Sequence, residues 1–349
     1  MTIPLVLVGL LALVLSLALP VVVKPLLRRL GVIDIPNSRS SHTIEVIRGM
    51  GVAVAIAILV ALAASLATGL IAVDRSLILV IILMVAAAAS LGWLEDFRGV
   101  SIRTRASAQL LIGAAGTAAL ATTIDESSYW WVPIGAVAFA TYINAANFMD
   151  GINGISGLHG VVVGVFYSFA GVISDQLWLT VSGMIVAAAF AGFLPWNLGR
   201  GFVFLGDVGS YLLGASIAAI AVTGLLAGVY LEYLLSPVLI YLADTFTTFL
   251  RRARRGERLY KAHRQHVYQR LTDTGLSHLQ VSLLVGGLSA LTAGAGFVLA
   301  TAPPPLAVSA SLFAAAVVAL YLYSPRILRT RGQRREDKSL HEEVPATDP

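Results

Sequence analysis

Carboxylate, amide and basic side chains gather in five short stretches of an otherwise apolar chain. The stretches read "DIPNSRSSH", "GWLEDFRGVSIRTRASAQ", "NFMDGINGIS", "PWNLGRGFVFLGDVGS" and "RRARRGERLYKAHRQHVYQRL". Their conspicuous polar residues are Arg39, His42, Glu95, Asp96, Arg105, Asn147, Asp150, Asn153, Asn197, Asp207, His263, Arg264 and His266. Burying such groups without partners costs several kcal/mol each. They must therefore lie in water or bind something.

This mixture of residue types favours phosphate chemistry. Carboxylate and amide oxygens are the ligands that Mg²⁺ prefers, and Arg and His side chains match phosphate oxygens. Neighbouring glycines such as Gly151 let the backbone approach a ligand closely. Together these residues predict group transfer from a phosphorylated donor with a divalent cation and a basic clamp. A zinc site is not expected, because the chain has no Cys and its six His are not spaced for zinc.

Most of these clusters also have a plain structural interpretation. Glu95 and Asp96 follow an apolar run, where acids are often ordinary helix ends at the membrane interface. Asn144 and Asn147 are three residues apart on one helical face, which equally suits a hydrogen bond between helices. Asp207 begins a predicted helix and is also a candidate N-cap.

The basic residues have alternatives as well. Arg251, Arg252, Arg254 and Arg255 are best interpreted as a positively charged membrane anchor. His263 and His266 are compatible with simple solvation. Arg39 and His42 lie in a long loop and are compatible with an ordinary surface.

The composition decides which class of protein must position these residues. Hydrophobic residues make up 57% of the 349 residues and charged residues 12%, with a mean hydropathy of +0.83. Soluble domains carry about a quarter charged residues, so we expect an all-α polytopic integral membrane protein with about 11 transmembrane helices. The apolar runs cover residues 3–23, 50–70, 77–94, 107–123, 131–147, 158–174, 177–194, 209–229, 234–250, 279–300 and 305–323.

We expect the N-terminal end of the chain to be a membrane helix and the C-terminal end to be a disordered tail. The first run lacks the basic start and the cleavage site of a signal peptide, so we interpret it as a retained helix. Residues 1–328 are expected to form one transmembrane domain. Residues 329–349 form a polar, charged tail that we expect to be disordered.

The loop charges predict the orientation in the membrane. We number the loops between the apolar runs from the N-terminus. Of the 24 Lys and Arg residues, 23 lie in the odd-numbered loops and the C-terminal tail, and Arg75 is the exception. The positive-inside rule then places these loops and the C-terminus in the cytoplasm, and the N-terminus outside. All five polar stretches fall on the cytoplasmic side. The net charge of +5 therefore indicates a surface facing anionic lipid, and nucleic acid is not an expected partner.

The five stretches, in this order, resemble the polyprenyl-phosphate N-acetylhexosamine-1-phosphate transferases, which are glycosyltransferases of family 4. The resemblance covers nearly the whole chain up to the tail. The "AHRQHVYQRL" segment looks most like the branch that initiates O-antigen or capsule synthesis. The resemblance implies a bacterial inner-membrane enzyme of cell wall or lipopolysaccharide biosynthesis, with its active site on the cytoplasmic face. It implies transfer of a sugar 1-phosphate from a UDP-sugar to polyprenyl (undecaprenyl) phosphate with release of UMP.

The resemblance also implies roles for individual residues. Asp207 and Asn147 match ligands of Mg²⁺, for which Mn²⁺ is a conceivable substitute, and Glu95, Asp96, Asp207 and Arg105 match catalytic positions. Asp150, Gly151, Asn153, His263, Arg264, His266, Arg39 and His42 are the substrate-binding candidates.

Two positions depart from the family pattern. Glu95 stands where an aspartate is usual, and Ile47 stands where a proline normally precedes the arginine of the first glycine-rich turn.

Three other functions are compatible with the sequence. A secondary transporter of an anionic or phosphorylated solute is the main alternative, although its polar residues would lie at mid-membrane in matched halves. A membrane prenyltransferase would need two aspartate-rich clusters, and only residues 95 and 96 are adjacent acids in these stretches. A non-enzymatic scaffold would not require polar clusters on one side. The identity of the sugar, the polyprenol length and the oligomeric state are not predicted, and a homodimer is compatible with the sequence.

Overall fold

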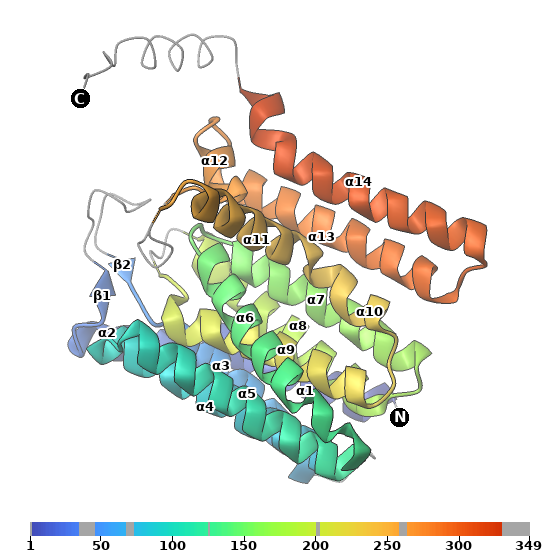
Figure 1. Ribbon diagram of the computed structural model, residues 1–349. Helices are drawn as coiled ribbons and strands as arrows, with labels where there is room; N and C mark the ends of the chain where they lie inside the picture. The colour runs from blue at the N-terminus through green and yellow to red at the C-terminus, as the bar shows by residue number, and fades with distance from the viewer. Residues whose placement is uncertain are drawn as a thin grey trace.

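The computed structural model describes residues 2–34, 46–67, 73–124, 126–199, 203–257 and 264–329. Within these ranges the chain is almost entirely helical, with one two-stranded antiparallel ribbon, β1 (Ile33–Asp34) and β2 (Val46–Ile47). The long helices run side by side, and the ribbon and α12 lie at one end of the bundle (Figure 1). The prediction of an all-α polytopic membrane protein is confirmed.

Ten helical segments of the described ranges are long and apolar enough to cross a membrane, and α3 (Gly51–Ala67) is a shorter apolar helix. The spanning helices of the first part are α1 (Thr2–Ala18) with α2 (Pro20–Arg29), α4 (Arg75–Arg98), α5 (Ile102–Ile124), α6 (Val132–Met149), α7 (Ile155–Ile173) and α8 (Leu177–Leu198). Those of the second part are α9 (Gly206–Leu226), α10 (Leu231–Leu235) with α11 (Leu239–Arg254), α13 (His278–Thr301) and α14 (Pro304–Leu328). These eleven segments correspond one to one with the predicted runs. The short helix α12 covers Val267–Thr272.

Proline explains the interruptions within two of the spans. Pro20 begins α2, where its missing N–H has no helical partner to lose. Pro237 lies in a short 3₁₀ turn, Ser236–Val238, between α10 and α11. A proline cannot donate the helical hydrogen bond, so the helix is divided at these points.

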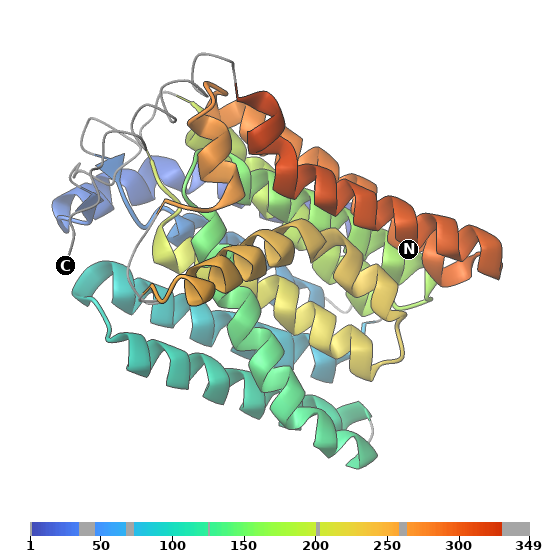
Figure 2. The same ribbon diagram turned by 45° about the horizontal axis from the view of Figure 1, so that its top comes forward.

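The centre of the bundle is α9. Of its most apolar 18-residue window, 89% is buried, compared with 17% for α14 at the edge. Helices α3, α4 and α6 pack around α9, and α13 and α14 form an outer pair (Figure 2). A residue at the start of α9 is therefore surrounded by the ends of several helices.

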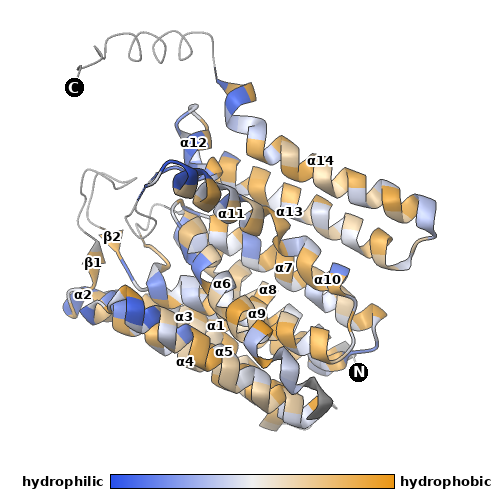
Figure 3. Ribbon diagram, viewed as in Figure 1, coloured by the Kyte–Doolittle hydropathy of each residue, from blue (hydrophilic) through white to orange (hydrophobic). Residues whose placement is uncertain are grey.

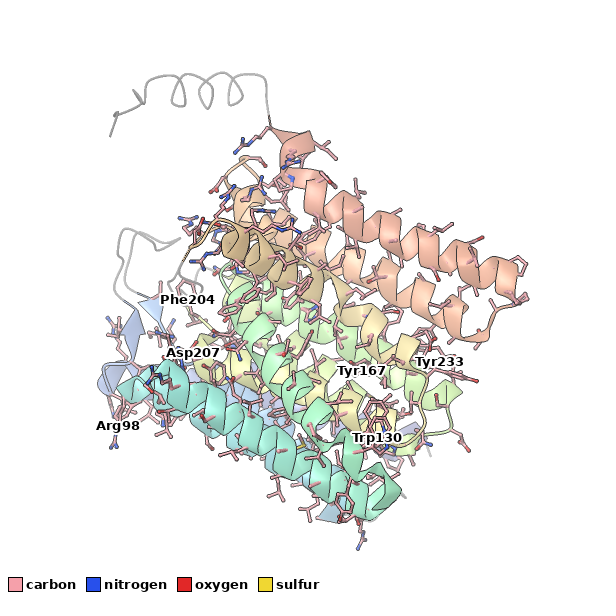
Figure 4. The ribbon with its side chains drawn as sticks, viewed as in Figure 1. Arg98, Trp130, Tyr167, Phe204, Asp207 and Tyr233 are labelled. Carbon is pink, nitrogen blue, oxygen red and sulfur yellow. The ribbon has the colours of Figure 1, made fainter. Side chains whose placement is uncertain are left out.

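Apolar residues cover most of the helix surfaces, and hydrophilic residues gather at the end of the bundle that holds α2, α12 and the end of α4 (Figure 3). Asp207 lies toward the same end as Arg98, whereas Trp130 and Tyr233 lie toward the opposite end (Figure 4). The structure thus places the described polar stretches together at one end of the bundle.

Candidate functional site

The segment after β2 runs beside the segment that leads into α9. The Phe204 N–H donates to the Ile47 carbonyl at 2.9 Å, and the Gly51 N–H donates to the Leu205 carbonyl at 2.8 Å. These backbone hydrogen bonds join parts of the chain about 155 residues apart. They bring Arg48 to the first turn of α9.

Asp207 lies in that first turn and receives two polar side chains. Arg48 Nη2 lies 2.6 Å from Asp207 Oδ2, and Asn147 Nδ2 donates to Asp207 Oδ1 at 2.6 Å. The Asp207 side chain is 13% exposed. The helix begins after Leu205, whose side chain makes no capping hydrogen bond. Asp207 is therefore not the N-cap that the sequence left open, because its carboxylate faces Arg48 and α6.

Asp96 lies at the end of α4 and is fully buried, with a side-chain exposure of 0%. Its Oδ1 accepts from the Asp207 N–H at 3.0 Å, and its Oδ2 accepts from the Val208 N–H at 2.9 Å. Arg48 Nε completes the set at 2.7 Å from Oδ1. A carboxylate at a helix N-terminus satisfies N–H groups that have no partner within the helix and complements the helix dipole. Asp96 thus holds the start of α9, and Arg48 bridges both carboxylates.

The neighbouring acid has a different set of partners. Glu95 Oε1 pairs with Arg105 Nη1 at 2.8 Å, and Glu95 Oε2 accepts from the Val100 N–H at 2.5 Å. Arg105 also donates to the Tyr211 hydroxyl at 3.4 Å. Glu95 therefore fixes the turn between α4 and α5 and orients Arg105 toward α9.

Glycines allow these helices to approach closely. A Cβ on Gly92 of α4 would overlap the backbone carbonyl of Asp207. Gly206 has a φ of +76°, and a Cβ there would lie 2.7 Å from Asp96 Oδ2. At both positions a side chain would push α4 and the start of α9 apart. Such a displacement would move the two carboxylates.

The stretch "NFMDGINGIS" ends α6 and begins α7, as predicted. Asp150 Oδ1 accepts from the Ser156 hydroxyl at 2.7 Å, and burial beneath the surrounding helices raises the pKa of Asp150 to about 8. The Gly154 N–H donates to Asn197 Oδ1 at 2.5 Å, and the Asn153 carbonyl accepts from the Ser282 hydroxyl at 2.9 Å. The backbone of this glycine-rich turn is therefore held by α8 and α13.

The two asparagines of α6 have different partners. Asn144 Nδ2 donates to Gln109 Oε1 of α5 at 2.6 Å, so the alternative of a hydrogen bond between helices is correct for Asn144. Asn147 contacts Asp207 and also donates to the Ser210 hydroxyl at 3.0 Å. Only the second asparagine therefore joins Arg48, Asp96 and Asp207, and these four residues are called the cluster below.

The basic stretch is only partly described. His266 is buried, with its Nδ1 3.0 Å from Asp244 Oδ1, and its ring stacks on Phe148. Arg264 is exposed and lies 3.9 Å from Asp273. The candidates Arg39, His42 and His263 lie outside the described residues.

The donor set in this cluster suits a hard divalent cation. Asp96 and Asp207 carry oxygens that already converge on one positive charge, the Arg48 guanidinium, and Asn147 adds an amide. Mg²⁺ commonly takes one or two carboxylates and completes its shell with water and phosphate oxygens. Nowhere in the described residues do three or more His, Cys, Asp or Glu side chains group to hold a metal ion, so they provide no closed all-protein cage.

Two central residues were missing from the predicted set. Arg48 bridges the two carboxylates, and its signal in the sequence is the "RGMG" turn, which departs from the family pattern because Ile47 replaces the usual proline. Asp244 lies fully buried in α11, and its signal was a lone acid within an apolar run. Neither position could be paired with its partners from spacing alone.

Comparison with known proteins places the cluster in context. The family model described as glycosyl transferase family 4 matches residues 77–225, which include Asp96, Asn147 and Asp207. The chain is 27% identical over 327 residues to a decaprenyl-phosphate N-acetylglucosaminephosphotransferase of Mycobacterium tuberculosis (strain ATCC 25618 / H37Rv), covering 80% of this chain and 78% of that protein.

Two further relatives come from other bacteria. One is a probable undecaprenyl-phosphate N-acetylglucosaminyl 1-phosphate transferase of Bacillus subtilis (strain 168), 25% identical over 78% of this chain and 80% of that protein. A phospho-N-acetylmuramoyl-pentapeptide-transferase of Clostridium beijerinckii (strain ATCC 51743 / NCIMB 8052) is 26% identical over 48% of this chain and 51% of its own length.

Proposed function

We propose that the chain is a member of glycosyl transferase family 4, the polyprenyl-phosphate hexosamine-1-phosphate transferases, and that it transfers N-acetylglucosamine 1-phosphate from UDP-N-acetylglucosamine to a polyprenyl phosphate. The products are UMP and a polyprenyl-diphospho-sugar. The sugar and the lipid are proposed from the names of two relatives. The protein would act in a bacterial inner membrane and begin a lipid-linked surface glycan. O-antigen or capsule synthesis remains the predicted use of that lipid.

The observation that carries the proposal is the convergence of Asp96, Asn147 and Asp207 at one end of the bundle. A lipid acceptor keeps its tail in hydrocarbon and presents its phosphate at the interface, whereas a sugar nucleotide arrives from water. A cluster at helix ends would allow both substrates to meet there. Transporters typically place their polar residues at mid-membrane on broken helices, where a lipid phosphate at the interface and a sugar nucleotide from water would not meet.

The reaction requires one bond to form and one to break. An oxygen of the acceptor phosphate attacks the β-phosphorus of the donor, and the bond from that phosphorus to the bridging oxygen breaks as UMP leaves with the electron pair. A phosphate monoester has its second pKa near 6, so it is already a nucleophile at pH 7. Asp96 is fully buried and accepts from three donors, which favours a positioning role over attack on the donor. We therefore propose direct displacement without a phosphoryl-enzyme.

The basic residues would offset the negative charge that gathers when the two phosphates meet. Arg48 and Arg105 both lie beside the start of α9. Each is paired with an acid that fixes its direction. A preorganised cation is effective because it needs no reorientation as charge develops. Asp96 already accepts from the Asp207 and Val208 N–H groups in the first turn of α9, so these two groups are not available to the phosphates.

Asp207 and Asn147 are the residues that would hold Mg²⁺, with Mn²⁺ as a substitute. The ion would supply charge neutralisation for the diphosphate. Asn147 donates its amide N–H to Asp207 Oδ1, which orders that carboxylate and leaves the amide oxygen as the atom suited to a cation.

The test is an assay of purified protein with UDP-N-acetylglucosamine, polyprenyl phosphate and Mg²⁺, measuring UMP release and the mass of the lipid product. A panel of other UDP-sugars identifies the preferred donor. Asp207→Asn should lower kcat by about 10²-fold or more, as expected for loss of a charged group at a phosphoryl centre. The control is Asp74→Asn, because Asp74 caps the far end of α4 and should tolerate the change.

Two results would contradict the proposal. One is full activity of Asp207→Asn in the presence of Mg²⁺. The other is uptake of the sugar nucleotide into proteoliposomes without any UMP, which would identify a transporter.

A further inference from the structure

A second polar centre lies in the C-terminal half of the chain, beyond the region matched by the family model. Its middle is Asp244, whose side chain is 0% exposed. The carboxylate is paired with five groups: His266 Nδ1 at 3.0 Å, the Val267 N–H at 3.0 Å, the Tyr268 N–H at 3.3 Å, the Tyr321 hydroxyl at 2.6 Å and the Thr248 hydroxyl at 3.2 Å. One buried acid thus joins α11, the start of α12 and α14.

The start of α12 depends on this acid. The Val267 and Tyr268 N–H groups lie in its first turn, where helical N–H groups have no partner within the helix. An isolated helix of six residues is not stable by itself. Because Asp244 accepts from these N–H groups, it determines where α12 begins and how it is oriented.

From α12 the contacts lead to the candidate site. The Tyr268 hydroxyl donates to the Phe148 carbonyl at 3.0 Å. That carbonyl belongs to the last turn of α6, where carbonyls lack helical partners. The same hydroxyl lies so close to Gly151 that a Cβ there would overlap it. Asn147, which contacts Asp207, immediately precedes Phe148.

We propose that Asp244 and Tyr268 are positioning residues for the turn that contains Asn147 and Asp150. Asp244 fixes α12, and Tyr268 of α12 holds the end of α6, so that Asn147 keeps its place against Asp207. The catalytic part of this inference rests on the proposed function. Displacing a site residue by about 1 Å can cost on the order of 10²-fold in rate. Loss of the hydrogen bond from Tyr268 to the Phe148 carbonyl can therefore lower the rate, although under this proposal neither residue touches the substrates.

The first experiment measures amide hydrogen exchange of the purified protein by mass spectrometry, comparing Tyr268→Phe with the unmodified protein. Removing only the hydroxyl should raise exchange several-fold in peptides covering residues 147–154. The matched control is Tyr167→Phe, because the Tyr167 hydroxyl also donates to a backbone carbonyl, that of Leu234, at 2.8 Å. This control should leave those peptides unchanged. Unchanged exchange in Tyr268→Phe, or equal changes in both variants, would overturn the inference.

The second experiment separates the positioning role from a general structural role. In Tyr268→Phe, kcat/KM for the donor should fall about 10- to 100-fold while KM for the lipid acceptor stays the same. Asp244→Asn should also lower kcat/KM for the donor without changing KM for the lipid acceptor, because its amide N–H₂ in either orientation would face a backbone N–H, that of Val267 or Tyr268, which can only donate. Equal increases in both KM values would contradict the positioning role.

The two experiments also distinguish the two proposals. Absence of UMP release from the unmodified protein would remove the proposed function, and the exchange measurement would still decide whether Tyr268 holds the turn. If Asp244→Asn does not fold, Tyr268→Phe alone decides the inference, because it keeps the ring and its packing.

Discussion

The two adjacent acids at the end of α4, Glu95 and Asp96, bind different partners. Asp96 faces the start of α9, whereas Glu95 faces Arg105 and the turn to α5. This division explains how a longer side chain is tolerated at position 95, because its carboxylate reaches the guanidinium of Arg105 at 2.8 Å. Arg48 joins the two carboxylates of the cluster through two different nitrogens. A planar guanidinium can make both contacts at once, whereas an ammonium group acts as a point charge.

Arg48→Met should destabilise the folded protein by about 1–3 kcal/mol, because it leaves Asp96 and Asp207 close together without the bridging cation. The lower part of that range reflects the 38% exposure of the Arg48 side chain. Arg48→Lys should recover part of the loss. Thermal unfolding of the purified protein measures both variants. Added Mg²⁺ should raise Tm more in Arg48→Met than in the unmodified protein, and equal melting of all three proteins would contradict the bridging role.

Asp150 should make stability depend on pH. Burial raises its pKa from the usual 3.8 to about 8, so the folded protein holds this proton more tightly than the unfolded chain. That contribution is fully present below about pH 4 and is lost as the pH rises through about 8. Between pH 5 and 8 the loss is up to about 1 kcal/mol per pH unit.

The measurement is Tm from pH 5 to pH 9. The Asp150→Asn curve should be flatter than that of the unmodified protein, since asparagine still accepts from Ser156 and does not titrate. Asp175→Asn, at an exposed turn between α7 and α8, is the control and should follow the unmodified protein. Parallel curves for all three proteins would disprove this assignment.

At the scale of elements, the close approach of α4 and α9 sets the geometry of the cluster. Gly92 lies against the backbone of Asp207, and Gly51 of α3 lies against Gly209. Small residues at such contacts let membrane helices approach without a gap. The carboxylate of Asp96 can therefore reach the first N–H groups of α9, which a wider separation would prevent.

Gly92→Ala should reduce activity at least tenfold, because the new methyl group must displace the start of α9 by a fraction of an ångström or more. Gly287→Ala is the matched control, since a Cβ at Gly287 of α13 meets nothing within 4 Å. Alanine there should be neutral or slightly stabilising. Activity and Tm are measured for both variants. Equal activity of the two variants would show that the helix contact does not set the site.

At the scale of the whole molecule, the charge distribution and the position of the site coincide. Hydrophilic residues gather at the end of the bundle that holds the cluster (Figure 3). The loops predicted to be cytoplasmic supply the described members of the cluster. We therefore propose that the site faces the cytoplasm.

The orientation can be tested directly, because the natural chain has no Cys. A single Arg98→Cys substitution at the site end should resist a membrane-impermeant thiol reagent in intact cells and react after lysis. A single Asp175→Cys substitution in an opposite loop should react in intact cells. Both residues are exposed, so access to the thiol is decided by the membrane. The reverse pattern of labelling would refute the predicted topology.

The number and positions of the helices were predictable from the sequence because both depend on local properties. An apolar run of sufficient length must form a helix in lipid, where every backbone N–H and C=O group needs an internal partner. The residue types of the site were predictable for a similar reason. Acids and amides beside glycines, such as Asp207 and Asn147, stand out against apolar surroundings.

The contacts themselves were decided by the tertiary structure. Arg48 and Asp207 are 159 residues apart, and their contact exists because backbone hydrogen bonds align the segments before α3 and α9. Helix packing also brings Asp96 to the start of α9 and His266 to Asp244. The residue types determine which polar groups are available, and the lengths of the apolar runs determine which segments span the membrane. Both properties are local, because each depends on a stretch of about twenty residues or fewer. Which groups meet is set by the packing of helices distant in the chain, which no local pattern specifies.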